Sequence, residues 1–313
     1  MKKIGLFMPI NSIHSLLRPI SQQLFTAYHD HYLAEQHAWI LLEKLLNKTK
    51  TELILRPVLP ITPEQSHEIT KWVGLLTQEK MPIQYLIGKV LFDDLEILIK
   101  PPTLIPRPET EEWVMNCIEM LKKLKNRNLY ILDIATGSGC VALALAHHLP
   151  QARVVATDIS RTALDLAHKN SIHNNIQNVT FIHSDLFNQI PKKYLFDIIV
   201  SNPPYIAESE RNDIDESVLN WEDEKALFAQ DNGLAIIKKI IDCAPEYIKQ
   251  NTEMILLNIP QLIIEIGYQQ GNLVKNYMIQ THYNNVSVHK DIYNKDRIVV
   301  GRIDNVASSH PSF

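Results

Sequence analysis

Hydrophobic residues follow a helical period in the first part of the chain. In residues 21–49, SQQLFTAYHDHYLAEQHAWILLEKLLNKT, apolar side chains recur near helical spacing, and no glycine or proline interrupts them. Another helix is predicted to begin in ITPEQSHEIT, because Thr62 can cap it, Pro63 suits its first position and Gln65 completes a capping box. These helices predict a small all-α domain over residues 1–80.

The spacing changes after residue 80. LEILIK alternates apolar and polar positions, as a strand does, and FDD just before it can form a tight turn. We therefore expect a β-hairpin linker over residues 81–108. IPRPETE then leads into a helix with Glu109, Glu111 and Glu112 in its first turn, where carboxylates are favoured.

From Leu129 onward, apolar strands alternate with helices. The strand candidates are LYILDIA, ARVVATDIS, VTFIHSD, FDIIVS and, near the end, RIVVGRI, and the helices between them include GCVALALAHHL and RTALDLAHKNSIHNN. This alternation implies a parallel sheet with helices on both faces. The predicted fold class for residues 109–313 is α/β, with a Rossmann-like doubly wound sheet.

Composition and charge narrow the function classes. The net charge is −4, so the average composition does not suggest the basic face of a duplex-binding enzyme, and we expect no direct DNA binding. The three cysteines form no CxxC pair, which argues against a disulfide framework or a zinc site. No stretch approaches the roughly 18 apolar residues of a membrane span. We expect a cytoplasmic protein with no membrane association.

A glycine-rich loop, DIATGSG at residues 133–139, lies between the first strand of the sheet and its helix. Such a loop lets a ligand approach the backbone and serves dinucleotides and other adenosyl ligands. Asp158 ends the next strand, about 20 residues after the glycines, where a carboxylate can accept hydrogen bonds from ribose hydroxyls. Asp185 ends the third strand, and Glu265 in IIEIG either lines the same edge or simply ends a strand. Each aspartate alone could be a helix cap, but together with the loop they favour a nucleoside cofactor.

The segment SNPPYI, residues 201–206, ends the strand FDIIVS in a stiff corner. An amide or nucleobase nitrogen is a poor nucleophile because its lone pair is delocalised into a π-system. The side-chain oxygen of Asn202 and the backbone carbonyl of Pro203 can accept both of its N–H hydrogen bonds. Pro203 and Pro204 fix the direction of that carbonyl, and Tyr205 offers a flat face to a planar group. We interpret the corner as a preorganised cradle for a planar amine, rather than as a rigid turn alone.

The cofactor class follows from what the loop lacks. No phosphate-binding lysine follows the glycines, and no acid or base for hydride transfer can be placed, so adenosylmethionine fits better than a nucleoside triphosphate or NAD. Methyl transfer needs only an aligned nucleophile, and no metal is implied. A metal site at His29, His31 and His37 is conceivable, but two of these point to different helix faces, and we favour no metal there.

Taken together, DIATGSG, TDIS, SDLF and SNPPYI resemble class I adenosylmethionine-dependent methyltransferases with an NPPY motif. PIQYLIG and LIPRPETEEWV narrow the resemblance to HemK/PrmC-type protein-(glutamine-N5) methyltransferases, which modify peptide chain release factors. The likeness runs from about HAWILLEKLL to RIVVGR, which is most of the chain. It implies a seven-stranded sheet with an antiparallel seventh strand and a helical N-terminal domain that helps to grip the substrate protein.

The resemblance also implies a role for each motif residue. Asn202, Pro203, Pro204 and Tyr205 would bind the glutamine side chain of a Gly-Gly-Gln loop in a release factor, with Asn202, Pro203 and Tyr205 serving the reaction itself. The expected cofactor-binding residues are Ala135, Thr136, Gly137, Ser138, Gly139, Asp158, Asp185, Leu186 and Asn202. We expect a monomer that binds S-adenosyl-L-methionine and a release factor.

The chain departs from the family pattern at three places. Ala135 stands where the family usually has glycine, Asp223 replaces an expected proline in NWEDEKAL, and residues 257–260 indicate a short insertion before IIEIG. These departures put local geometry in question but leave NPPY intact. Three alternatives stay open: methylation of a glutamine in a large-subunit ribosomal protein, adenine-N6 methylation of nucleic acid, and a non-catalytic partner-binding module.

Overall fold

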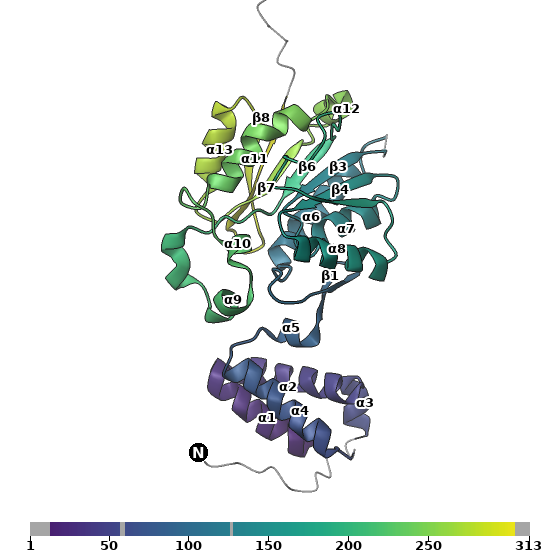
Figure 1. The fold of residues 1–313 in the computed structure, drawn as a ribbon, viewed down its shortest axis with the longest axis vertical. Coiled ribbons are helices and arrows are strands. Elements are labelled where there is room, and N and C mark those ends of the chain that lie inside the picture. The colour runs from purple at the N-terminus through teal and green to yellow at the C-terminus, as the bar shows by residue number, and fades with distance from the viewer. Residues whose placement is uncertain (1–12, 57–59, 126–127, 304–313) are drawn as a thin grey trace, which may run out of the picture. The chain divides into compact units, whose positions relative to one another are not determined.

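A computed structural model describes residues 13–56, 60–125 and 128–303 (Figure 1). Internal contacts divide the chain into two compact units. The first, helical unit runs up to Ile87 and also includes Glu216–Trp221, and the second contains Gly88–Asp215 and the chain from Glu222 onward. The domain borders predicted at residues 80 and 108 stay predictions. The first twelve and the last ten residues of the chain lie outside the described residues.

The helical unit forms where the apolar period predicted it, but residues 21–49 do not make one helix. His29 adopts a left-handed backbone conformation with φ 56°, and Asp30 then caps a new helix by accepting from the amides of Tyr32 and Leu33. The predicted capping box of Thr62 and Gln65 is present, with Pro63 at the helix start. The helices are α1 Ile13–Tyr28, α2 His31–Leu46, α3 Lys50–Leu55, α4 Pro63–Thr77, α5 Ile83–Ile87 and α9 Glu216–Trp221.

The predicted hairpin is present as β1, Lys89–Phe92, and β2, Leu95–Leu98, paired antiparallel with Asp93 in the turn at φ 52°. By its contacts it belongs to the second unit. The buried Asn170 side chain fastens it there, because its amide donates to the carbonyl of Leu98 at 3.0 Å and accepts from the amide of Leu98 at 2.8 Å. Asn170 also donates to the carbonyl of Ser138 at 2.9 Å, so one side chain holds both the hairpin and the glycine-rich loop.

A seven-stranded sheet forms the centre of the second unit, in the order β5-β4-β3-β6-β7-β9-β8. All neighbouring pairs are parallel except the two that involve β9, so the seventh strand is antiparallel, as predicted. The apolar pattern did not indicate β8, because that strand is polar and half-exposed. The strands are β3 Tyr130–Ile134, β4 Arg153–Asp158, β5 Val179–His183, β6 Ile198–Ser201, β7 Leu262–Glu265, β8 Asn284–Lys290 and β9 Asp296–Arg302.

Helices cover both faces of this sheet, as a doubly wound fold requires (Figure 1). On one face, Ile237 and Ile241 of α11 and Met278 of α13 join a buried cluster with Ile199 and Leu262 of the central strands. Within the described residues, no helix is long and apolar enough to cross a bilayer. The helices are α6 Pro108–Leu121, α7 Cys140–His148, α8 Arg161–His173, α10 Glu224–Leu227, α11 Ala235–Cys243, α12 Thr252–Leu256 and α13 Gly271–Gln280, with 3-10 turns η1 Glu208–Asp213 and η2 Ala244–Tyr247.

Candidate active site

The predicted site residues meet at one edge of the sheet. Strands β3 to β7 are parallel, so their carboxyl ends lie on the same side, and that is where ligands bind in open α/β folds. The register aligns Ile134 with Thr157 and Ser201, and Ser201 with Ile264. The loop after β3, Asp158 at the end of β4, Asp185 after β5 and Asn202 after β6 are therefore neighbours in sheet order, although 67 positions separate Ile134 from Ser201.

Asp158 holds the glycine-rich loop directly. Its Oδ2 accepts a hydrogen bond from the amide of Gly137 at 2.8 Å, and its Oδ1 accepts from the amide of Ser160 at 2.8 Å. Burial raises the pKa of Asp158, and these two amides partly offset that rise. Each carboxylate oxygen keeps a further lone pair, so the side chain can both shape the loop and accept from ribose hydroxyls.

The loop tolerates alanine at its first position. Ala135 adopts a left-handed conformation with φ 60°, which costs an alanine roughly 1 kcal/mol relative to glycine and explains the usual preference. Hydrogen bonds on both sides hold this turn, from the amide of Thr136 to the carbonyl of Thr157 at 2.9 Å and from Gly139 to Thr136 at 2.8 Å. A Cβ at Gly137 would have no atom of the described residues within 4 Å. The space beside the loop is therefore open to a ligand.

Asp133, at the end of β3, is a further candidate that the sequence analysis did not single out. It is 1% exposed, and Thr136 Oγ1 donates to its Oδ2 at 2.6 Å, whereas its Oδ1 makes no hydrogen bond of ordinary geometry with the described residues. Burial raises the pKa of Asp133 to about 7, against the lowering effect of the Thr136 hydroxyl. A buried acceptor that lacks a well-aligned donor among the described residues fits a site that receives a polar ligand.

Asp185 and Leu186 lie just beyond β5, beside the end of β4. Asp185 is exposed, and its amide donates to Oε1 of Gln189 at 3.1 Å. Leu186 has a left-handed φ of 49°, and the hydroxyl of Ser184 donates to its carbonyl at 2.7 Å, which stabilises the turn. Both residues therefore border the same edge as Asp158.

The carboxamide of Asn202 is oriented by a chain of buried hydrogen bonds. The hydroxyl of Thr110 donates to Oε2 of Glu265 at 2.7 Å, so its oxygen can only accept from Asn202. Nδ2 of Asn202 lies 3.2 Å from that oxygen and donates to it. The side-chain oxygen of Asn202 is therefore left to accept from another partner. Neither the spacing nor the periodicity could link Thr110 to Asn202, because 92 positions separate them.

Glu265, at the end of β7, anchors this chain. It is 1% exposed and accepts from Thr110 and from Nε1 of Trp113, both at 2.7 Å, and from the hydroxyl of Tyr205 at 3.3 Å. Burial raises the pKa of Glu265, and these donors and the nearby Arg297 counteract the rise. Burial and the charge of Glu265 raise the pKa of Tyr205, so its phenol stays protonated. The hydrogen bond from that phenol to Glu265 holds the ring in place.

The backbone of the NPPY corner is also fixed. Nε2 of Gln270 donates to the carbonyl of Tyr205 at 2.8 Å, and Oε1 of Gln270 accepts from the amide of Gly267 at 2.9 Å. A Cβ at Gly233 would lie 2.0 Å from the carbonyl oxygen of Tyr205, so only glycine fits there. Pro203 is buried, whereas Asn202, Pro204 and Tyr205 are half-buried.

The segment after NPPY is tied to the start of α6. Arg107 donates to Oε1 and Oε2 of Glu222 at 2.7 and 2.6 Å, and the carboxylate of Glu222 is buried. The amide of Asp223 donates to the carbonyl of Pro102 at 2.7 Å, and its side chain caps α10 through the amide of Lys225. A proline could not make the first of these bonds, so Asp223 is compatible with an ordered segment.

One further sequence feature lies away from this edge. The predicted insertion at residues 257–260 follows α12 and precedes β7, so it lies at the amino end of that strand, where Asn258 has φ 54°.

The histidines of the helical unit have other partners. His31 stacks on Phe25 at 3.7 Å, and His37 contacts the hydroxyl of Tyr28 at 3.1 Å. No candidate metal cluster in the described residues includes the histidines of this unit.

Two family models and several relatives match this chain. Residues 15–88 match the family model described as the PrmC N-terminal domain, and residues 117–225 match the methyltransferase small domain. A release factor glutamine methyltransferase from Flavobacterium psychrophilum is 36% identical over 283 residues, which cover 88% of this chain and 94% of that relative. Another from Lactococcus lactis subsp. lactis is 42% identical over 242 residues, 76% of this chain and 83% of the relative.

Among solved structures, a release factor-specific protein-(glutamine-N5) methyltransferase from Alicyclobacillus acidocaldarius is 23% identical with a TM-score of 0.38, and the match covers 64% of this chain and 95% of that chain. The extent and identity of the sequence relatives settle the family. The chain belongs to the release factor glutamine methyltransferase family.

Proposed function

We propose that this chain methylates N5 of the glutamine in the Gly-Gly-Gln motif of a peptide chain release factor, with S-adenosyl-L-methionine as the methyl donor. The observation that carries the proposal is the chain of hydrogen bonds from Glu265 through Thr110 to Asn202. It leaves the side-chain oxygen of Asn202 as an oriented acceptor beside the rigid Pro203 carbonyl. The names of the relatives supply the substrate class.

The carboxyl edge of the sheet fits the proposed cofactor. The space beside Gly137 is open, Asp158 can accept from ribose hydroxyls, and Asp133 has a buried acceptor atom. When bound, adenosylmethionine would supply an electrophilic methyl group. The residues proposed to hold it are Ala135, Thr136, Gly137, Ser138, Gly139, Asp158, Asp185, Leu186 and Asn202.

The NPPY corner would then activate the substrate amide by orientation. Asn202 Oδ1 and the Pro203 carbonyl accept its two N–H hydrogen bonds, which turns the amine and aims the nitrogen lone pair. Pro204 stiffens the corner, and Tyr205, held by its hydrogen bond to Glu265, stacks on the planar amide. The amide proton leaves after methylation, so the site needs no strong general base.

Recognition of the whole substrate protein is proposed for the helical N-terminal domain, residues 1–80, with residues 81–108 as a linker to the methyltransferase domain, residues 109–313. The match of residues 15–88 to the PrmC N-terminal domain supports this role. We further propose a cytoplasmic monomer that does not bind DNA, and the net charge of −4 supports the last point.

The test is incubation of the purified chain with labelled adenosylmethionine and four acceptors: a release factor, its Gln→Ala variant in the Gly-Gly-Gln motif, a large-subunit ribosomal protein and DNA. Label on the wild-type release factor alone supports the proposal. Label on the Gln→Ala variant at an equal level contradicts the acceptor assignment, and label on the ribosomal protein or DNA alone contradicts the substrate class.

A further inference from the structure

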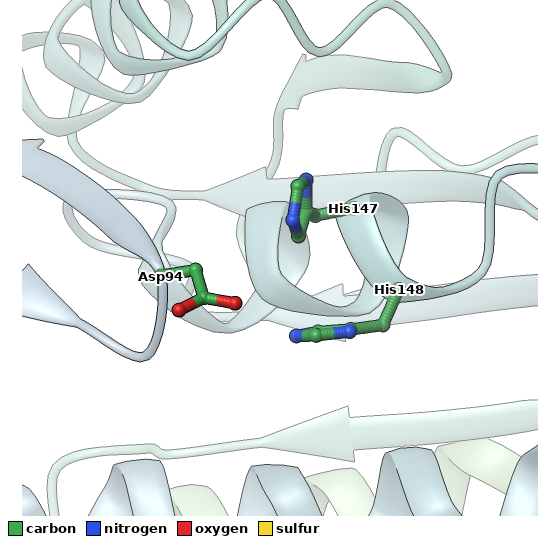
Figure 2. Close-up of side chains that lie close together, drawn as sticks. All are labelled: Asp94, His147 and His148. Carbon is green, nitrogen blue, oxygen red and sulfur yellow. The ribbon is translucent and has the colours of Figure 1, made fainter.

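Two histidines and two aspartates come together where the β1–β2 hairpin meets the end of α7. Asp93 and Asp94 form the hairpin turn, and His147 and His148 are the last two residues of α7. Figure 2 shows the Asp94 carboxylate reaching from the hairpin toward the two imidazole rings. One ligand atom from each of Asp94, His147 and His148 lies within 4.8 Å of the others. Both elements belong to the second unit, so their fold sets this arrangement.

Asp93 adds a second carboxylate to the group. Its Oδ2 is hydrogen-bonded to Nε2 of His148, and both side chains are 17% exposed. A carboxylate beside an imidazole is the arrangement that orients histidine ligands or bridges to the metal itself.

This set of donors matches a particular class of ion. Imidazole nitrogen with carboxylate oxygen suits zinc and related first-row divalent ions. Tetrahedral bonds of about 2.0–2.1 Å would place ligand atoms roughly 3.3 Å apart. Asp94 and His147 are exposed, and the group's ligand atoms already lie within 4.8 Å of one another.

The location separates this group from the proposed methyl transfer. The glycine-rich loop precedes the first residue of α7, Cys140, whereas the histidines end that helix. Nine residues of helix span about 13 Å. An ion here would bridge the hairpin turn and α7, and it would strengthen the attachment of the hairpin to that helix.

We propose that Asp94, His147 and His148, with Asp93 as the fourth group, form a zinc-binding site that clamps the β1–β2 hairpin to α7. An ion that binds only to the folded chain stabilises it, and the stabilisation grows with the logarithm of the ion concentration. The site is therefore a structural clamp, distinct from the methyl-transfer centre.

The test uses the full chain without a histidine tag, stripped with EDTA, and carrying Cys243→Ser because that exposed thiol could bind zinc by itself. Calorimetric titration with zinc chloride and thermal unfolding with and without zinc are measured for this parent protein. The two test variants are Asp94→Asn and His147→Ala. The matched control is His173→Ala, which removes an exposed histidine that contacts Glu96 of the same hairpin at 2.8 Å but lies outside the group.

We expect one zinc ion per chain and a rise in the unfolding midpoint for the parent and for His173→Ala. Asp94→Asn and His147→Ala are expected to weaken binding by about 10-fold or more and to lose the zinc-dependent rise. Equal midpoints in EDTA establish that both variants fold. Absence of zinc binding by the parent, or binding undiminished in both test variants, would overturn the proposal.

Discussion

Nδ2 of Asn202 lies 3.2 Å from the hydroxyl oxygen of Thr110, and that hydroxyl gives its only proton to Glu265. The direction of the Asn202 amide is thus set by a buried carboxylate on a different strand. Its acceptor oxygen is oriented before any substrate arrives, which reduces the reorganisation that the reaction requires. Substitutions along this chain of hydrogen bonds can separate this orientation from the overall stability of the fold.

Replacing Thr110 with valine should lower turnover while preserving the shape of the side chain. Valine offers neither a donor to Glu265 nor an acceptor to Asn202, so the amide of Asn202 loses its fixed direction. A hydrogen bond to a charged group contributes about 1.5–3 kcal/mol, which corresponds to roughly a 10- to 100-fold loss in kcat. Steady-state methylation of a release factor measures this loss in kcat. Thr110→Ser keeps the hydroxyl and should retain most activity, and equal kcat in Thr110→Val and the wild type would contradict the positioning role.

Asn202→Ala should abolish turnover and largely spare the fold. Asn202 is half-buried and donates one hydrogen bond to Thr110, so its removal costs little packing. The substrate amide, however, loses one of the two acceptors proposed to aim its lone pair. Single-turnover methylation and the thermal midpoint are measured together on the same preparation. Turnover near the wild-type level in a folded variant would rule out the cradle.

Glu265→Gln should destabilise the second unit as well as slow the reaction. Glutamine can place its oxygen where Thr110 and Trp113 both donate, but its NH2 group then faces the Tyr205 hydroxyl, which can no longer donate there. Hydrogen bonds to a charged group contribute about 1.5–3 kcal/mol and neutral ones about 0.5–1.5 kcal/mol, so losing the charge should cost about 1 kcal/mol or more. The midpoint of urea unfolding, followed by the fluorescence of Trp113 and the other tryptophans, measures the loss. A variant with an unchanged midpoint and unchanged kcat would show that Glu265 does not anchor the site.

Asp133 should make the stability of the cofactor-free protein depend on pH. Its folded pKa is raised to about 7, above the usual value near 3.8, so the folded state keeps the proton longer than the unfolded state. Its contribution to stability is therefore fully present below about pH 4 and is lost as pH rises to about 7, by no more than about 1.4 kcal/mol per pH unit. The unfolding free energies of wild type and Asp133→Asn are compared at pH 5 and pH 7.5. The wild type should lose more stability than the variant over this interval, and parallel pH profiles would contradict the assignment.

Local patterns in the sequence determined much of this protein. The capping box of Thr62 and Gln65, the alternation of strands and helices, the glycine-rich loop and the NPPY corner all depend on residues a few positions apart, whose spacing and backbone preferences can be read directly. The family resemblance added the antiparallel seventh strand. The structure contains that strand, and this confirms the fold class. The break at His29 and the polar strand β8 escaped the same patterns, because neither is marked by glycine, proline or an apolar period.

Only the tertiary structure decided the relationships between distant residues. Thr110 and Glu265 are 155 positions apart, Asn170 and Leu98 are 72 apart, and Asp93 and His148 are 55 apart. Trp221 likewise joins the helical unit through the carbonyl of Glu79, 142 positions earlier. Hydrogen bonds of this kind depend on how strands and helices pack in three dimensions, and packing leaves no periodic mark on the sequence of either partner.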